Sequence, residues 1–153
     1  MKKDVVLDRL KGVERFDIDE MNEGDEKITA EDLMQSICLL DDVDTIADKK
    51  IRVEILELRD DLLETGRHQR VTTICFTHQI FQGTKGKKTL SETTSVVLFP
   101  RAGSMYHIER YVKVYCGLPS KTLKRVIQVP SRWVLISRTY PMYVVHERGA
   151  FLL

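Results

Sequence analysis

The sequence predicts an α/β fold with a mainly parallel sheet flanked by helices and a small antiparallel edge near the C-terminus. Three short strand-like runs, at residues 37–40, 71–77 and 95–99, are separated by segments of helical character. A strand, a long helix over 47–65 and a second strand follow one another in the order of a βαβ unit. The strands of such a unit lie parallel.

The acidic first part of the chain leads into the first strand. Residues 1–30 alternate acids with scattered apolar residues, and we expect a connecting segment there. At its end Asp32 follows three residues after Thr29, which is the pattern of a capped helix start. The run at 37–40 is wholly apolar and bounded by polar residues, which predicts a strand buried on both faces.

The clearest element is an amphipathic helix over residues 47–65. Its apolar residues recur at spacings of four, three and four, and charged residues fill the opposite face. The recurring residues are Ile51, Ile55, Leu58 and Leu62. Gly66 supplies a C-terminal stop. The β-branched run at 71–77 then predicts a second buried strand.

More helices and a pair of strands are expected in the rest of the chain. Helical patterns occur at residues 90–93, 104–116 and 120–127. Two strand-like runs follow, at 133–137 and 142–146, with Pro141 between them. Proline at this place predicts a turn, and the two runs therefore predict the small antiparallel edge.

The composition is that of a globular protein, with 42% hydrophobic and 31% charged residues. No apolar stretch is long enough for a membrane span, and acids close to Met1 argue against a secretory signal. Cys38, Cys75 and Cys116 are odd in number and widely spaced. This pattern favours reduced thiols in an intracellular setting, without a metal motif.

Charge is divided along the chain. Residues 1–64 hold 10 Lys/Arg and 20 Asp/Glu, a balance of −10, whereas residues 65–153 hold 14 and 3, a balance of +11. A basic C-terminal part suits contact with the phosphates of a nucleotide or of a nucleic-acid backbone. The alternative is that the two parts complement each other electrostatically within one fold.

Acids gather where the first predicted strand ends. Asp41, Asp42 and Asp44 follow the apolar run at 37–40, and ligands of parallel α/β sheets bind at the carboxyl ends of strands. One carboxylate there could hold Mg²⁺ beside a nucleotide's phosphates, and the next could orient or deprotonate a water. The alternative is a solvated acidic loop that favours the N-terminus of the following helix.

Polar residues end the second predicted strand, and two arginines lie close to strands. Thr77, His78 and Gln79 would lie beside the acids if the two strands are neighbours. Arg67 follows the long helix and Arg101 follows the third strand. Either could act as an arginine finger on a transferring phosphoryl group. The alternatives are an ordinary surface histidine and two cations without a catalytic role.

The basic segment at residues 83–89 is not a Walker A motif. That motif has four residues between its glycines and then Lys-Ser/Thr, whereas Gly83 and Gly86 are three apart. We expect a mobile basic loop, exposed to solvent or in contact with a nucleic-acid backbone.

In order, these segments resemble the P-loop ATPases of nucleocytoplasmic large DNA viruses, and most of all the poxvirus-type DNA-packaging ATPases of the HerA–FtsK group. The resemblance covers residues 36–101. It rests on Cys-Leu-Leu-Asp-Asp-Val-Asp, on Gly-Arg-His-Gln-Arg-Val-Thr-Thr-Ile-Cys-Phe-Thr-His-Gln, and on Ser-Val-Val-Leu-Phe-Pro-Arg. In that group an acidic pair ends one strand, an Arg-His pair precedes the next, a Gln lies near its end, and an Arg follows the third strand.

The resemblance implies roles for the residues named above. Asp41 would bind Mg²⁺ with ATP, and Asp42 would activate the attacking water. Gln79, or His78 in its place, would sense the γ-phosphate, and Arg67 or Arg101 would act across a subunit interface. The Walker A loop of the family is missing from these 153 residues. Residues 1–30 would then be a connecting segment, and residues 31–153 the C-terminal portion of a P-loop NTPase domain.

The function expected from this resemblance is that of a viral ATPase which couples ATP hydrolysis to DNA packaging or translocation. It would need a Walker A-bearing segment supplied elsewhere. The chain would have been split from that segment by truncation, by separate genes or by incomplete sequence. We expect double-stranded DNA as partner, a homo-oligomeric ring, no membrane, and a place in the cytoplasm of an infected cell or in the virion. The alternatives are a non-catalytic regulatory remnant and a different P-loop nucleotidase, such as a helicase.

Overall fold

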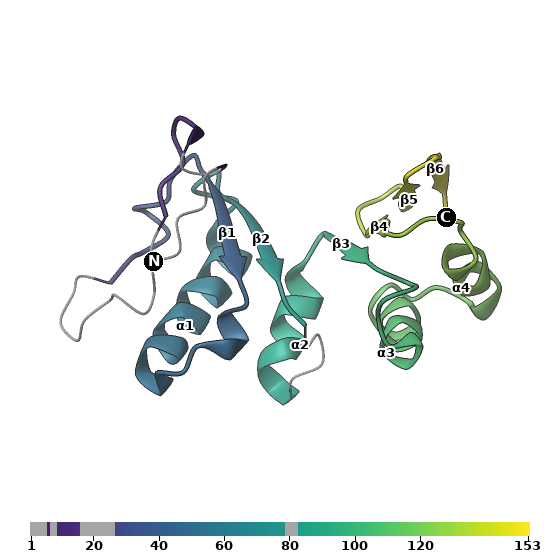
Figure 1. Cartoon of the computed structure of the whole chain (residues 1–153), viewed down its shortest axis with the longest axis horizontal. Helices are drawn as coiled ribbons and strands as arrows, with labels where there is room; N and C mark the ends of the chain where they lie inside the picture. Colours follow the sequence, from purple (N-terminus) through teal and green to yellow (C-terminus); the bar gives the residue numbers. More distant parts are fainter. Residues whose placement is uncertain (1–5, 7–8, 16–26, 79–82) are drawn as a thin grey trace. The chain divides into compact units, whose positions relative to one another are not determined.

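A computed structural model describes residues 6, 9–15, 27–78 and 83–153 (Figure 1). The chain forms two compact units, Met1–His78 and Gln79–Leu153, and each is described by itself. The division falls inside residues 31–153, the range that the sequence predicted as one portion of a domain.

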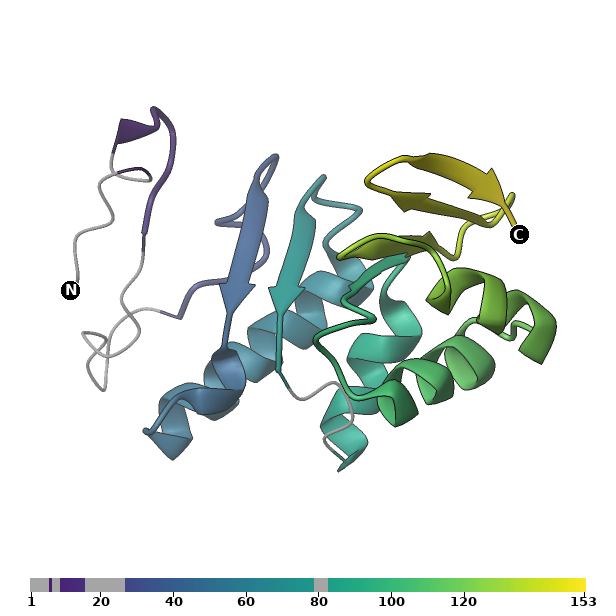
Figure 2. The ribbon, with the colours of Figure 1, turned by 45° about the vertical axis from the view of Figure 1, so that its right-hand side comes forward.

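The first unit is built around a parallel strand–helix–strand unit. Strand β1 (Ile37–Asp41) leads through a short 3-10 turn, η3 (Val43–Thr45), into helix α1 (Lys49–Thr65) and then strand β2 (Thr72–Phe76). The two strands pair in parallel register, with Leu39 opposite Ile74. Figure 2 shows α1 crossing one face of the pair. The predicted α/β character and the parallel pairing of these two strands are confirmed.

Helix α1 begins after a capping aspartate and ends at a glycine. Asp48 is its N-cap, since its carboxylate accepts hydrogen bonds from the Lys50 and Ile51 amides at 2.7 and 3.1 Å. The amphipathic pattern is confirmed because the side chains of Ile55, Leu56 and Leu62 are buried. The helix ends at Gly66, where an added Cβ would lie 2.4 Å from the carbonyl oxygen of Leu62. A side chain at this position would force the backbone to move.

The β1–β2 pair is buried on one face only. Cys38, Leu40 and Cys75 point toward α1 and pack in its core. The opposite face carries four exposed apolar side chains, with exposed fractions between 41% and 67%: Ile37, Leu39, Ile74 and Phe76. The prediction that both strands are buried on both faces is therefore wrong among the described residues. A run of apolar residues predicts a strand, but it does not determine whether a second layer covers the other face of the sheet.

The second unit contains a four-stranded sheet and several helices. They are α2 (Gly83–Glu92), β3 (Ser95–Leu98), α3 (Met105–Arg110) continued by the π-helical turn η4 (Tyr111–Tyr115), α4 (Ser120–Ile127), β4 (Val134–Ser137), β5 (Tyr143–His146) and β6 (Gly149–Leu152). Helix α4 has the bounds that the sequence predicted. In Figures 1 and 2, α3 and α4 lie on the same side of the strands β4, β5 and β6.

The pairing of β3 differs from the prediction of a mainly parallel sheet. The four strands lie in the order β3-β4-β5-β6, and every neighbouring pair is antiparallel. The predicted antiparallel edge is confirmed and is larger than expected, because β3 and β6 join it. Strand direction is decided by the partner rather than by the strand's own residues. Here Leu98 lies opposite Val134, and Ser95 opposite Ser137.

The core of the second unit is made by buried residues from its helices and its sheet. Tyr111, Val112, Val126, Val134, Ile136 and Val144 are fully buried there. Such apolar burial is the main source of stability for a domain of this size. No helix among the described residues combines the length and apolar character that crossing a bilayer requires.

The segment expected to be a mobile basic loop, residues 83–89, is the first part of helix α2 instead. Two contacts outside the segment explain the difference. Leu90 at the other end of the helix is buried in the core. The Arg138 guanidinium donates hydrogen bonds to the carbonyls of Leu90, Ser91 and Thr93, which satisfies the end of the helix. Neither contact can be read from residues 83–89.

Candidate functional site

Asp41 and Asp42 belong to different elements, because strand β1 stops between them. Asp41 is the last residue of β1 and is exposed. Asp42 adopts a left-handed backbone conformation, with φ 46° and ψ 35°, and starts the turn into Val43, whose side chain is buried. Aspartate tolerates this conformation better than most residues. Because β1 ends at Asp41, the alternation of faces in a continued strand does not force the carboxylates of Asp41 and Asp42 to opposite sides of the sheet.

The two strand ends meet, as the sequence predicted. Thr77 donates a hydrogen bond from its hydroxyl to an Asp44 carboxylate oxygen at 2.8 Å. His78 places Nε2 3.6 Å from an Asp42 carboxylate oxygen. Because β1 and β2 run parallel, their carboxyl ends lie at the same edge of the sheet. We call the group Asp41, Asp42, Asp44, Thr77 and His78 the acidic edge.

The acidic edge is open to solvent. The Asp42 side chain is 41% exposed and that of His78 is 86% exposed. The contact between the two is therefore weak in water and leaves their polar atoms free to turn toward a ligand. An accessible carboxylate beside an imidazole can accept a proton from a bound water.

At the acidic edge, a Mg²⁺ ion would need ligands beyond the protein's own side chains. No group of three or more His, Cys, Asp and Glu side chains in the described ranges could hold a metal ion by itself. Mg²⁺ is usually held by one or two carboxylates together with waters and substrate phosphates. The exposed carboxylate of Asp41 could supply one such ligand.

The structure gives separate positions for the remaining predicted site residues, Arg67 and Arg101. Arg67 is exposed and lies in the turn between α1 and β2, which is the opposite end of the parallel pair from Asp42. Arg101 is exposed and follows β3 in the second unit. Gln79 lies outside the described residues. Arg67 is therefore remote from the acidic edge of its own unit, and a role at such a site would require a second subunit.

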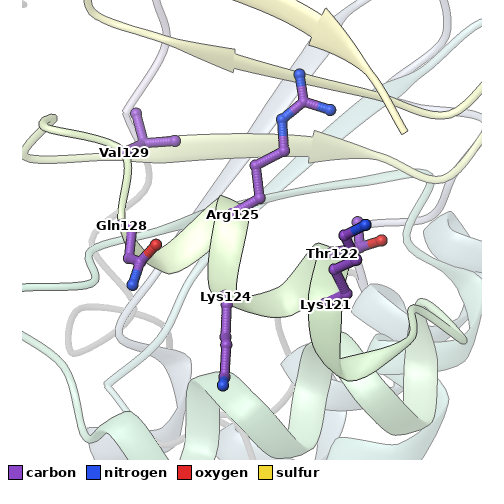
Figure 3. A pocket seen from close by; sticks show the side chains of 6 residues that line it. All are labelled: Lys121, Thr122, Lys124, Arg125, Gln128 and Val129. Carbon is purple, nitrogen blue, oxygen red and sulfur yellow. The ribbon is translucent and has the colours of Figure 1, made fainter.

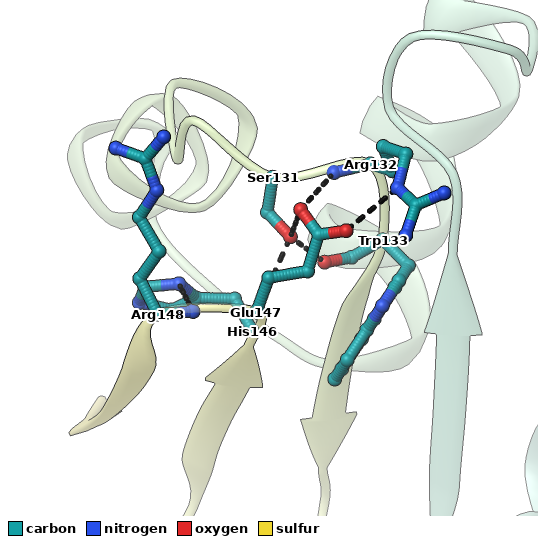
Figure 4. Close-up of polar contacts among 6 residues, drawn as sticks. All are labelled: Ser131, Arg132, Trp133, His146, Glu147 and Arg148. Carbon is teal, nitrogen blue, oxygen red and sulfur yellow. Dashed lines mark hydrogen bonds and ion pairs between the residues drawn. The ribbon is translucent and has the colours of Figure 1, made fainter.

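A second polar cluster joins the ends of β4 and β5 (Figure 4). Glu147 accepts hydrogen bonds from the Arg132 Nε at 2.7 Å, the Arg132 amide at 3.0 Å and the Ser131 hydroxyl at 3.2 Å. The bonds from Arg132 lower the pKa of Glu147 below its ordinary value of 4.5. Ser131 is buried and also donates to the carbonyl of Trp133 at 2.6 Å. These contacts fasten two strands together and present no nucleophile to solvent.

The sequence interpretation missed this cluster, although a signal was present. Arg132 comes just before one predicted strand and Glu147 just after the next. In an antiparallel pair the start of one strand lies beside the end of its neighbour, here with Val134 opposite His146. Opposite charges at those two places predict an ion pair. Arg59 was missed too, a buried cation in the apolar stripe of α1 that is paired with Asp60 at 2.7 Å.

The cysteines are free thiols, as predicted. Burial raises the pKa of all three, and that of Cys75 to about 11. A thiol reacts as its thiolate, so these side chains are poor nucleophiles at neutral pH. They belong to the packing of the two units.

Comparison with known proteins finds a similar protein from a virophage. No protein-family model matches it, and no solved structure does. A protein of Sputnik virophage, described as uncharacterized protein V3, is 38% identical over 122 residues, which are 78% of this chain and 49% of the virophage protein. The chain is thus similar to a viral protein over most of its own length and spans about half the length of that relative.

Proposed function

We propose that this chain supplies the water-activating side of an ATP-hydrolysis site in a viral ATPase that couples hydrolysis to DNA packaging or translocation. The observation that carries the proposal is the acidic edge, where Asp42 and His78 lie 3.6 Å apart at the ends of parallel strands. The similarity to a virophage protein supports a viral setting. The proposal also follows the resemblance to viral packaging ATPases.

Each residue of the proposed site would have a separate role in ATP hydrolysis. Asp42 would accept the proton of a water as its oxygen attacks the γ-phosphorus, and the bond to the bridging oxygen breaks to give ADP and inorganic phosphate. His78 or Gln79 would contact the γ-phosphate or that water. Mg²⁺ held by Asp41 would neutralise charge on the phosphates. Arg67 or Arg101 would act from a neighbouring subunit of a ring.

A phosphate-binding loop is the part that these residues do not contain. Without its backbone amides and lysine, the phosphates are bound only weakly. We therefore expect the 153 residues alone to show no ATP turnover. Mixing them with a Walker A-bearing segment should produce activity.

The test is ATP hydrolysis by that reconstituted assembly. Asp42→Asn removes the proton acceptor and keeps the side-chain size, so kcat should fall by about 10²–10⁴-fold, the range of general-base catalysis. Asp48→Asn is the matched control, because asparagine caps a helix as well as aspartate does. It should leave kcat unchanged. Full activity of Asp42→Asn would remove Asp42 from the proposed role.

The absence of a Walker A sequence favours one alternative, a non-catalytic binding or regulatory module. Such a module would bind its partners with the same affinity in the Asp42→Asn variant and would show no turnover with any Walker A-bearing segment. Another P-loop nucleotidase, such as a helicase, would instead show turnover coupled to strand separation.

A further inference from the structure

Helix α4 carries a row of cations along its exposed face. Lys121, Lys124 and Arg125 are spaced i, i+3 and i+4, which places them on one side of the helix, and the amide of the C-cap Gln128 continues this row at i+7. The opposite face is buried in the core of the second unit through Leu123 and Val126. The cationic face is thus held rigidly in place by the packing of the buried one.

These side chains line an open hollow of about 570 Å³ together with Thr122 and Val129 (Figure 3). Every polar side chain in the lining is a cation, a hydroxyl or an amide, and none is a carboxylate. In Figure 3 Arg125 extends toward the strands, whereas Lys124 extends the opposite way. The cations are therefore spread over a surface rather than gathered around one point.

The charge of this surface is not balanced inside the described structure. Residues 79–153 contain 12 Lys/Arg and 3 Asp/Glu. Two of those acids are engaged elsewhere, Glu109 with Lys113 at 3.6 Å and Glu147 with Arg132 at 2.7 Å. Among the described residues no carboxylate forms an ion pair with the three cations of α4.

One of the cations is held in position by an aromatic ring. The Arg125 guanidinium carbon lies 4.0 Å from the centre of the Phe151 ring in β6. A cation–π contact of this kind restrains the long side chain and leaves its N–H donors available. The side chain therefore gives up less conformational entropy when Arg125 binds an anion.

We propose that the α4 surface, formed by Lys121, Thr122, Lys124, Arg125 and Gln128, binds the phosphate backbone of double-stranded DNA. Lysine, arginine, threonine and glutamine are the side chains that contact DNA phosphates without reading sequence. A duplex carries about one charge per 1.7 Å of its axis, and an eight-residue helix is about 12 Å long, so several phosphates lie within reach. The inference rests on the proposed function for the choice of duplex DNA among polyanions.

The test is binding of a fluorescein-labelled duplex of random sequence, followed by anisotropy at several salt concentrations without ATP or Mg²⁺. The triple variant Lys121→Gln/Lys124→Gln/Arg125→Gln should bind at least about 10-fold more weakly. The slope of log affinity against log salt should fall by about one for each phosphate that the variant no longer neutralises. Circular dichroism should match wild type, because the three side chains lie on the face of α4 opposite the buried Leu123 and Val126.

The matched pair is Lys124→Gln against Lys113→Gln, two exposed lysines of the same unit, the second of which is paired with Glu109. Only Lys124→Gln should weaken binding and reduce the salt slope. An unchanged affinity and slope in the triple variant would overturn the proposal. Equal competition by polyglutamate at matched charge would overturn it in favour of an acidic protein partner. If the wild-type chain bound DNA as expected but its assembly with a Walker A-bearing segment hydrolysed no ATP, only the proposed function would be contradicted.

Discussion

At the scale of single residues, backbone conformation and a few polar contacts decide what each side chain can do. Asp42 occupies the left-handed region, and the chain there turns from β1 toward α1. A β-branched residue at this position would be strained. The backbone conformation is thus a structural requirement at Asp42, separate from its proposed catalytic role, and Asp42→Asn tests that role alone, since asparagine also accepts this conformation.

Glu147 gives a residue-scale prediction about pH. Its pKa is lowered by the hydrogen bonds from Arg132, so its contribution to stability is complete above the ordinary value of 4.5. The contribution disappears as the pH falls through the lower pKa of the folded state. We expect Glu147→Gln to lower Tm at neutral pH and to flatten the decline of Tm between about pH 5 and pH 3.

Thermal unfolding followed by circular dichroism over that pH range measures both effects. Glu109→Gln is the control, because it removes another carboxylate of the same unit, one paired with Lys113. An acid limb of Glu147→Gln as steep as that of wild type would show that the contacts of Glu147 do not contribute to folding.

At the scale of elements, α1 is the crossover that places the two strand ends at one edge. Its start depends on Asp48, whose carboxylate accepts from the amides of Lys50 and Ile51. Asp48→Ala leaves these amides without a side-chain acceptor, and we expect the free energy of unfolding to fall by about 1 kcal/mol. Asp48→Asn should retain wild-type stability.

Urea unfolding of the three proteins measures the difference. The midpoint should shift without a change in the slope, because the same amount of surface becomes exposed on unfolding. Equal midpoints for Asp48→Ala and wild type would mean that α1 starts independently of this cap.

At the scale of the whole molecule, one apolar face of the parallel pair lacks a covering layer among the described residues. Leu39 and Ile74 lie opposite each other on that face, 56% and 41% exposed. Parallel sheets are usually covered on both faces. We expect the isolated chain to self-associate as its concentration rises, because exposed apolar surface promotes association.

Sedimentation velocity over a range of concentrations tests this expectation. Leu39→Thr/Ile74→Thr keeps strand-forming residues and removes apolar surface, so it should shift the protein toward monomer. Val114→Thr is the control, since Val114 is 66% exposed and lies in the other unit. A wild-type protein that stays monomeric at every concentration would contradict the prediction.

The sequence alone determined most elements, because their signals are local. The spacing of apolar residues between residues 47 and 65 predicted α1, and the bounds of α4 agree with its pattern. The runs at 37–40 and 71–77 predicted two parallel strands, since they are joined by a helical crossover, and polar ends that meet if the strands are neighbours. Their catalytic roles stay predictions.

Only the tertiary structure decided the features that depend on residues far apart. Ser95–Leu98 pairs with Val134–Ser137 in antiparallel direction, and no pattern within either run states its partner. The C-terminal end of α2 is held by the core packing of Leu90 and by Arg138, far along the chain. The burial of Leu39 likewise depends on whether another layer packs on its face of the sheet. Periodicity reports which residues share a face, whereas pairing and burial depend on what that face meets in space.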